Sequence, residues 1–261
     1  MDGLTPSIIF MYPNYFYPKQ YVFRMIASML LGRHRSFRLD ACNLIAHQQL
    51  APQILGREFI PIHGPCVITF NHYHRVGFQA WWLALNVTAV VEQEMHWVVT
   101  GEFTFPGDWY GFLGRPISRW FLRRLANCYG FTSMPPMPPR PQDAENRAAA
   151  VRRVLSFIKH TPEPILGLAP EGGDNLDGKL VMPAPGAGRF GLMLADCGLR
   201  FIPVGAYETD GVFCLKFGPG YDLKIPPGLT AREKDTRAAR FIMQSIANLL
   251  PEHLQGDFNL P

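Results

Sequence analysis

The chain has 261 residues, of which 48% are hydrophobic and 18% are charged, and its formal net charge is +4. This composition describes a globular protein long enough for one large domain or two small ones. The charge is too small for a nucleic-acid-binding protein, and no Lys/Arg stripe interleaved with aromatic residues occurs, but it is compatible with an anionic membrane surface.

Residues 1–50 differ in character from the rest of the chain. Aromatic side chains cluster between Tyr12 and Phe23, and apolar residues follow at helical spacing from Val22 to Leu30 with five basic residues around them. This pattern is typical of a helix that lies in the headgroup region of a membrane. A helix packed on the domain's own core has the same pattern, so both interpretations stay open for this segment.

From about residue 51 the pattern alternates between strands and helices. We expect strands at 66–70, 95–100, 164–168 and 199–207, and a hairpin around 212–217. Helices are expected at roughly 77–90 and at 117–128, with a third that begins at 143 and a fourth that ends near 198. Asp143 is expected to cap its helix, and Thr230 with Glu233 predicts a capping box for a last helix. The loop 132–142 contains five prolines, which argues against regular structure there.

These elements predict an α/β fold: a single domain over 51–261 with a mainly parallel mixed sheet flanked by helices, preceded by the amphipathic segment 1–50. The cysteines are scattered, odd in number and never spaced as C-x-x-C, so we expect reduced thiols and no metal site. The sequence starts without the features of a signal peptide. Its longest apolar, uncharged run, 77–91, is shorter than the ~20 residues that span a bilayer. We therefore expect a cytoplasmic protein that is peripheral on the membrane.

Polar residues follow two of the expected strands. Asn71, His72 and His74 come after the first strand, and Glu171 with Gly172 comes after the strand 164–168. The carboxyl ends of strands are where α/β proteins place their chemistry, and a histidine there can act as a general base. A histidine that only hydrogen-bonds a loop, or a glutamate that only caps a turn, would give the same pattern.

Residues 186–191 read G-A-G-R-F-G and match the G-x-G-x-x-G fingerprint of dinucleotide-binding proteins, with Glu208 at the end of a later strand. Pro183 and Pro185 interrupt the strand that should precede the glycines. The motif also comes too late in the chain for a complete second nucleotide-binding half. We therefore expect no nucleotide cofactor.

Four blocks in the same order resemble those of the glycerolipid acyltransferases, the PlsC-like family of lysophosphatidic acid acyltransferases. They read I-L-G…G-P-C-V-I-T-F-N-H at 54–72, an Arg-rich block at 111–131, L-A-P-E-G at 168–172 and F-I-P-V at 201–204. The resemblance implies transfer of a fatty acyl group, without metal or other cofactor, from acyl-CoA or acyl-carrier protein to the hydroxyl of a lipid or other acceptor. It implies His72 as the base and Glu171 as the second catalytic residue.

The substrate-binding residues that we infer beside these two are Asn71, His74, Arg140, Gly172, Gly173 and Asp174. The chain departs from the family at three places. Gly77 stands where an acid should orient the histidine, and Asp174 or Glu102 could replace that acid. Gly173-Asp174 stands where Thr-Arg should meet a phosphate, which disfavours a standard glycerol phosphate acceptor. Arg140 is the nearest substitute for the arginine that the second block lacks.

Two functions follow from these residues. One is an active O-acyltransferase, and the alternative is a catalytically silent relative that binds acyl chains or membranes. The retention of His72, Glu171 and Gly172 favours the enzyme.

Overall fold

A single sheet of seven strands forms the centre of the molecule. The computed structural model describes residues 12–259 apart from 14, 104–110, 174 and 176, and in these residues the strand order is β1-β7-β6-β2-β5-β3-β4. The only antiparallel pairing among the described strands is that of β6 with β7, which confirms the mainly parallel mixed sheet. The strands are β1 (Gln53–Leu55), β2 (Cys66–Phe70), β3 (His96–Thr100), β4 (Thr132–Met134), β5 (Ile165–Leu168), β6 (Arg200–Thr209) and β7 (Val212–Phe217).

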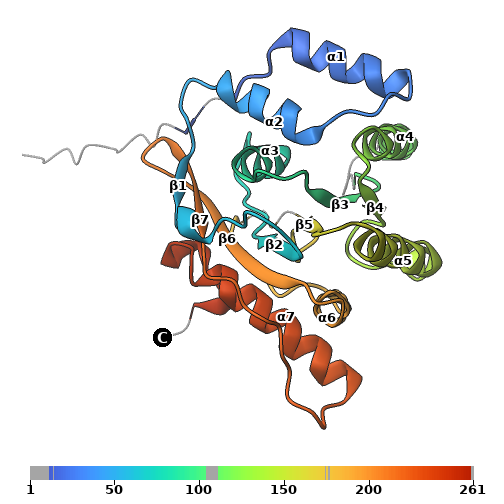
Figure 1. The fold of residues 1–261 in the computed structure, drawn as a ribbon, viewed down its shortest axis with the longest axis vertical. Coiled ribbons are helices and arrows are strands. Elements are labelled where there is room, and N and C mark those ends of the chain that lie inside the picture. Colours follow the sequence, from blue (N-terminus) through green and yellow to red (C-terminus); the bar gives the residue numbers. More distant parts are fainter. Residues whose placement is uncertain (1–11, 14, 104–110, 174, 176, 260–261) are drawn as a thin grey trace, which may run out of the picture.

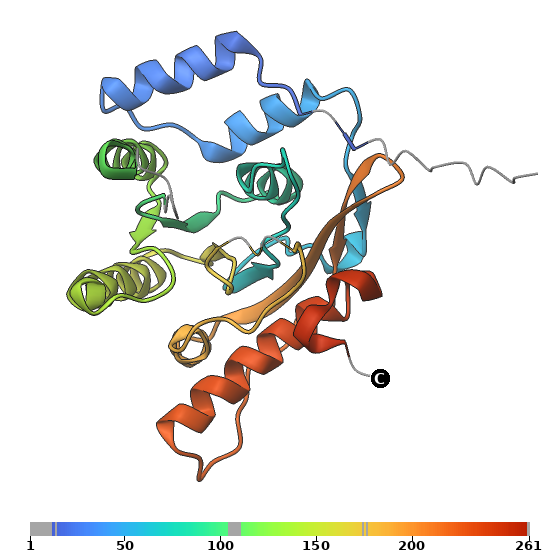
Figure 2. The same cartoon turned by 180° about the vertical axis from the view of Figure 1, so that it is seen from behind.

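Helices cover both faces of this sheet (Figures 1 and 2). On one face α3 lies next to the strands, with α2 and then α1 stacked outside it, whereas α6 and α7 cover the opposite face. Near the β4 edge, α4 and α5 lie on opposite sides of the sheet (Figure 1). The helices are α1 (Lys19–Leu30), α2 (Phe37–Ala46), α3 (Trp81–Val90), α4 (Gly111–Tyr129), α5 (Ala144–His160), α6 (Ala187–Asp196) and α7 (Ala231–Ala247).

The central strand β2 positions the candidate site. All five of its residues are buried, as expected for a strand between two other strands with helices on both faces. It pairs in parallel with β6 on one side and β5 on the other. The chain therefore leaves β2 and β5 at the same edge of the sheet, which brings the two predicted polar blocks together.

Some element boundaries differ from the expectation. The proline-rich loop contains the short strand β4, which pairs in parallel with β3, so the prediction of no regular structure there was wrong. Helix α3 begins at Trp81 rather than near 77, because Gly77 adopts a left-handed φ of 82° in the preceding turn. Helix α4 begins at Gly111 and accommodates Pro116, which the prediction had left outside the helix.

The two predicted helix caps had different outcomes. Thr230 and Glu233 form the capping box at the start of α7, as expected. Asp143 does stand directly before α5, but its side chain makes no capping hydrogen bond. Its carboxylate accepts from Arg140 Nε at 2.5 Å instead, because an arginine is a stronger partner than a backbone N–H.

The two helices of the N-terminal segment differ in burial. Phe37, Ala41 and Leu44 of α2 belong to the main core, so α2 is a core helix. Helix α1 buries Met29 in a small cluster with α4 and leaves Phe23 73% exposed. No helix in the described part of the chain combines the length and the apolar content needed to cross a bilayer.

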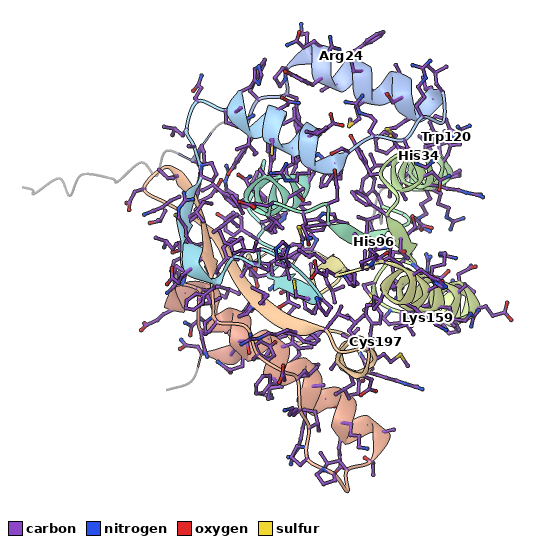
Figure 3. All side chains as sticks on the ribbon, in the orientation of Figure 1. Arg24, His34, His96, Trp120, Lys159 and Cys197 are labelled. Atoms are coloured by element: carbon purple, nitrogen blue, oxygen red, sulfur yellow. The ribbon has the colours of Figure 1, made fainter. Side chains whose placement is uncertain are left out.

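A buried histidine makes the stability of this fold sensitive to pH. His96 of β3 bonds through Nε2 to the Thr132 hydroxyl at 2.9 Å, and its ring stacks on Phe157 at 4.0 Å between centroids. Figure 3 shows it near β3, inside the molecule. Burial lowers the pKa of His96 from 6.5 to about 4.

We expect the fold to lose stability as the pH falls through the interval from 6.5 to about 4. In that interval the unfolded state binds a proton on this imidazole that the folded state excludes, so acid favours unfolding. The loss between pH 7 and pH 5 should be about 2 kcal/mol from this group. Urea unfolding at both values measures it, and His96→Gln should remove most of the difference. An equal loss in His96→Gln would contradict this assignment.

Candidate active site

A hydrogen bond joins the two predicted blocks. The backbone N–H of His72 donates to Oε2 of Glu171 at 2.6 Å, across 99 residues of sequence. His72 lies two residues beyond β2 and Glu171 lies three residues beyond β5. The bond therefore brings the two blocks together at the carboxyl edge of the sheet.

Glu171 is a buried carboxylate with several partners, only 8% exposed. Its Oε1 accepts from the backbone N–H of Val181 at 3.2 Å, so one side chain bonds to two separate segments. The tight turn after it uses Gly172 at φ 71°, and the Gly172 N–H donates to the carbonyl of Ala169 at 3.1 Å. Only a residue that tolerates this backbone conformation fits the turn.

Asn71 holds the start of the His72 segment. Its side-chain amide donates to the carbonyl of Ala206 at 2.8 Å, and its side-chain oxygen accepts from the N–H of Ala206 at 2.7 Å. This two-way bond to β6 holds the amide inside the protein, where Asn71 is 3% exposed. Asn71 therefore contributes to the geometry of the site from within the fold.

His74 and Gly173, two more of the predicted substrate-binding residues, lie around the same turns. The backbone of His74 packs against the loop at Gly178, where a Cβ would come within 2.7 Å of the His74 carbonyl oxygen. Gly173 has open space around it, with nothing within 4 Å of an added Cβ. Asp174 lies outside the described residues.

Arg140 lies in an ion cluster apart from these turns. Its guanidinium donates to Glu102 at 3.2 Å and to Asp143 at 2.5 Å, and Arg119 also bonds to Glu102. Burial would raise the pKa of Glu102, but the two arginines outweigh it and lower the pKa below its usual range. The bonds of Glu102 among the described residues therefore include those to Arg119 and Arg140, and its proposed role beside His72 stays a prediction.

An apolar pocket opens beside the Glu171 turn. Its cavity volume is about 160 Å³, and it is open to solvent at its mouth. Strand ends of β3, β4 and β5 form its floor, the turn 168–172 forms one wall, and α5 and the start of α6 close it. Its lining includes Met137, Arg147 and Val151.

Arg147 is the cation of this pocket, and the sequence analysis missed it. Its guanidinium donates to the Pro136 carbonyl at 3.0 Å and to Met137 Sδ at 3.5 Å. Burial lowers the pKa of Arg147, and none of the described carboxylates forms a salt bridge with it. Its place on α5 gave no sequence signal that separates it from neighbouring surface arginines.

The glycine motif has a structural use. A Cβ on Gly188 would lie 1.9 Å from the carbonyl oxygen of Asp235 in α7, and one on Gly191 would lie 2.7 Å from Ile242. The Asp235 carboxylate also accepts from the N–H groups of Gly186 and Arg189 at 2.7 Å each. A carboxylate of the chain therefore occupies the helix start that would hold a nucleotide phosphate, and the glycines allow close packing of α6 on α7.

Glu208 is the acid that follows the glycine motif at the end of a later strand, where a dinucleotide-binding protein has an acid that binds the ribose. In this structure it has a different role. Its side chain is 1% exposed and pairs with Arg75. It also accepts from the hydroxyls of Tyr15 at 2.6 Å and Tyr73 at 3.0 Å. Burial, followed by the hydrogen bond to Glu208, raises the pKa of Tyr15, so this hydroxyl stays protonated and remains a donor.

Comparisons with known proteins give little further information. No model of a protein family matches the sequence, and no curated protein matches it. One solved structure that resembles the fold is that of the 1-acyl-sn-glycerophosphate (LPA) acyltransferase PlsC from Thermotoga maritima. The two share 16% sequence identity with a TM-score of 0.44, over 86% of this chain and 78% of that chain. A similarity this weak supports no conclusion about activity.

Proposed function

We propose that this protein transfers a fatty acyl group from acyl-CoA or an acyl-carrier protein to a hydroxyl group, with His72 as general base. The observation that carries the proposal is the bond between the His72 backbone and the buried Glu171, beside an apolar pocket. At this edge of the sheet, His72 as the proposed base and the turn that carries Glu171 lie next to an apolar space for the acyl chain.

The reaction needs one proton transfer and one exchange of bonds. His72 takes the proton of the acceptor hydroxyl while the hydroxyl oxygen attacks the thioester carbonyl. A carbon–oxygen bond forms, the carbon–sulfur bond breaks, and His72 returns the proton to the departing thiolate. Glu171 supports this step by fixing the backbone of His72, and His74, Gly172 and Gly173 are proposed to contact the substrates.

The pocket is proposed to hold the acyl chain, since most of its lining is apolar. We propose that the acceptor is not a standard glycerol phosphate, because the carboxylate of Asp174, after Gly173, would repel its phosphate. Arg140 is held by two carboxylates, and Arg147 is the better candidate for contact with a polar group of the substrate.

Gly77 gives the alternative its support. This chain has Gly77 where the family that it resembles has the acid that orients the histidine, and in a well-measured hydrolase the replacement of such an acid costs about 10⁴ in rate. A protein that binds acyl chains without turnover would therefore keep the pocket and lack the reaction. The activity of the wild-type protein separates these two functions.

His72→Ala should lower acyl transfer by about 10² to 10⁴, the usual contribution of a general base. The measurement uses labelled acyl-CoA with a lipid extract as acceptor, and with water as acceptor for slow hydrolysis. His160→Ala is the matched control, because His160 lies at the exposed end of α5. Turnover that is equal in His72→Ala and in the wild type would refute the role of His72. Binding of acyl-CoA without turnover in the wild type would favour the silent relative.

Val151→Phe should shift the acyl preference toward shorter chains, because the larger ring takes up part of the pocket at α5. Values of kcat/KM for a series of acyl-CoA lengths measure this shift. We expect the longest good substrate to lose at least about tenfold, since one or two methylenes contribute about 1–3 kcal/mol. Val212→Phe makes the same change in the β6–β7 hairpin and should leave the series unaltered. An unaltered series in Val151→Phe would show that the chain binds elsewhere.

We also propose that α1 and α4 bind the membrane through a shared face, called here the α1–α4 surface. Its exposed apolar residues are Phe23, Ile26, Leu30, Leu31, Leu113, Ile117 and Trp120. Figure 3 labels Arg24 on α1 and Trp120 on the side of α4 that points away from the sheet. Residues 16–36 and 111–129 contain no Asp or Glu, so this surface suits anionic lipids.

The wild-type protein should therefore float with vesicles of phosphatidylcholine that contain phosphatidylglycerol, and less so at high salt. Phe23→Ser with Trp120→Ser should reduce the bound fraction at least about tenfold, because each buried ring contributes about 1.5–3 kcal/mol. Phe241→Ser is the matched control, since Phe241 is similarly exposed, at 45%, on α7. Equal losses in the control, or no flotation of the wild type, would refute this surface.

A further inference from the structure

In the segment 71–75, which carries His72, every second side chain forms hydrogen bonds with β6. Asn71 bonds in both directions to the backbone of Ala206. Two residues on, Tyr73 donates to Glu208 at 3.0 Å, and Arg75 donates to the same carboxylate. Side chains alternate along an extended segment, so these three side chains fix the register in which His72 and His74 leave the segment on the other side.

Glu208 is the centre of this attachment. Arg75 binds both of its oxygens, through Nε to one and through Nη2 at 3.0 Å to the other. Such a two-pronged pair fixes the orientation of both groups. With the hydroxyls of Tyr15 and Tyr73, the carboxylate has four donors although it is almost fully enclosed.

The N-terminal segment completes the same cluster. Tyr15 reaches Glu208 over 193 residues of sequence, and its ring stacks on Trp82 at 5.0 Å between centroids. The guanidinium of Arg75 also donates to the Pro13 carbonyl at 3.2 Å and lies 4.4 Å from the centre of the Tyr12 ring. Tyr12, Pro13 and Tyr15 therefore contact the Arg75–Glu208 pair that holds the His72 segment.

Gly77 shows where an acid at that position would point. A Cβ built there meets Nη1 of Arg75 at 3.6 Å, and the residue has a left-handed φ of 82°. An aspartate at 77 would thus be strained, and it would face Arg75, the partner of Glu208. In this chain the carboxylate that holds the segment is therefore Glu208 on β6.

We propose that Arg75 and Glu208 are positioning residues that hold His72 in its reactive orientation, and that Tyr15 makes the N-terminal segment part of this support. The inference rests on the proposed role of His72 as a base. A base that shifts by about 1 Å can lose about 10² in rate, which is why a rigid attachment one to three residues from His72 matters to the reaction.

The experiment compares Arg75→Gln, Glu208→Gln and Tyr15→Phe with a matched control, Arg35→Gln. Arg35 forms an ion pair with Asp40, which also accepts from the Tyr129 hydroxyl at 2.8 Å. The control therefore breaks an arginine–carboxylate–tyrosine cluster of the same chemistry at the α2–α4 contact. The two readouts are kcat and KM for acyl transfer, and the side-chain NMR resonances of His72 in ¹⁵N-histidine protein, assigned with His72→Ala.

We expect the three site variants to lower kcat at least about tenfold with little change in KM, and to move the His72 resonances. Arg35→Gln should lower thermal stability without either effect. If Arg75→Gln fails to fold, Tyr15→Phe tests the same link by removing a single hydroxyl. Unmoved His72 resonances in folded Tyr15→Phe and Glu208→Gln would overturn the proposal. Inactive wild-type protein would overturn the proposed function alone, because the resonances would still report the attachment.

Gly77→Asp gives an independent test, with Gly77→Ala as control for the backbone strain. We expect the aspartate to compete with Glu208 for Arg75 and to lower kcat further than the alanine does. A higher kcat in Gly77→Asp than in the wild type would mean that an acid at 77 orients His72 directly, and it would overturn the proposal.

Discussion

Two buried carboxylates hold the chain in place where it leaves the central strand. A carboxylate removed from water destabilises the fold unless hydrogen bonds or a cation compensate it. Glu171 meets this requirement with the N–H groups of His72 and Val181. Glu208 meets it with Arg75 and two tyrosine hydroxyls. Because each acid needs partners from distant parts of the sequence, the turn at His72 can form only when β5, β6 and the N-terminal segment are in place.

Much of the fold could be predicted because the signal was local. The strands β2 and β5 are unbroken apolar runs, and the capping box of α7 lies within four residues. Strand β4 could not be found in this way. It has three residues beside a proline-rich loop, and it exists because β3 offers it a parallel partner. The length of α4 was missed for a similar reason, since its tertiary packing outweighs the cost of Pro116.

The sequence predicts which residue types form the candidate site better than it predicts their hydrogen-bond and ion-pair partners. His72 and Glu171 stand after recognisable strands, so their meeting followed from the parallel sheet. Arg140 was chosen by its distance along the sequence, yet its guanidinium bonds to Glu102 and Asp143. Helical geometry instead brings Arg147 to the pocket. Ion-pair partners depend on three-dimensional proximity, which sequence spacing does not encode.

The edges of the sheet limit how the molecule can associate with others. Its two outer strands, β1 and β4, have three residues each. Edges this short offer few unpaired backbone groups to another chain, and natural proteins use short edge strands to prevent sheets from joining. The protein can therefore expose an apolar helical surface to a lipid or protein partner while its sheet remains a poor template for strand-to-strand aggregation.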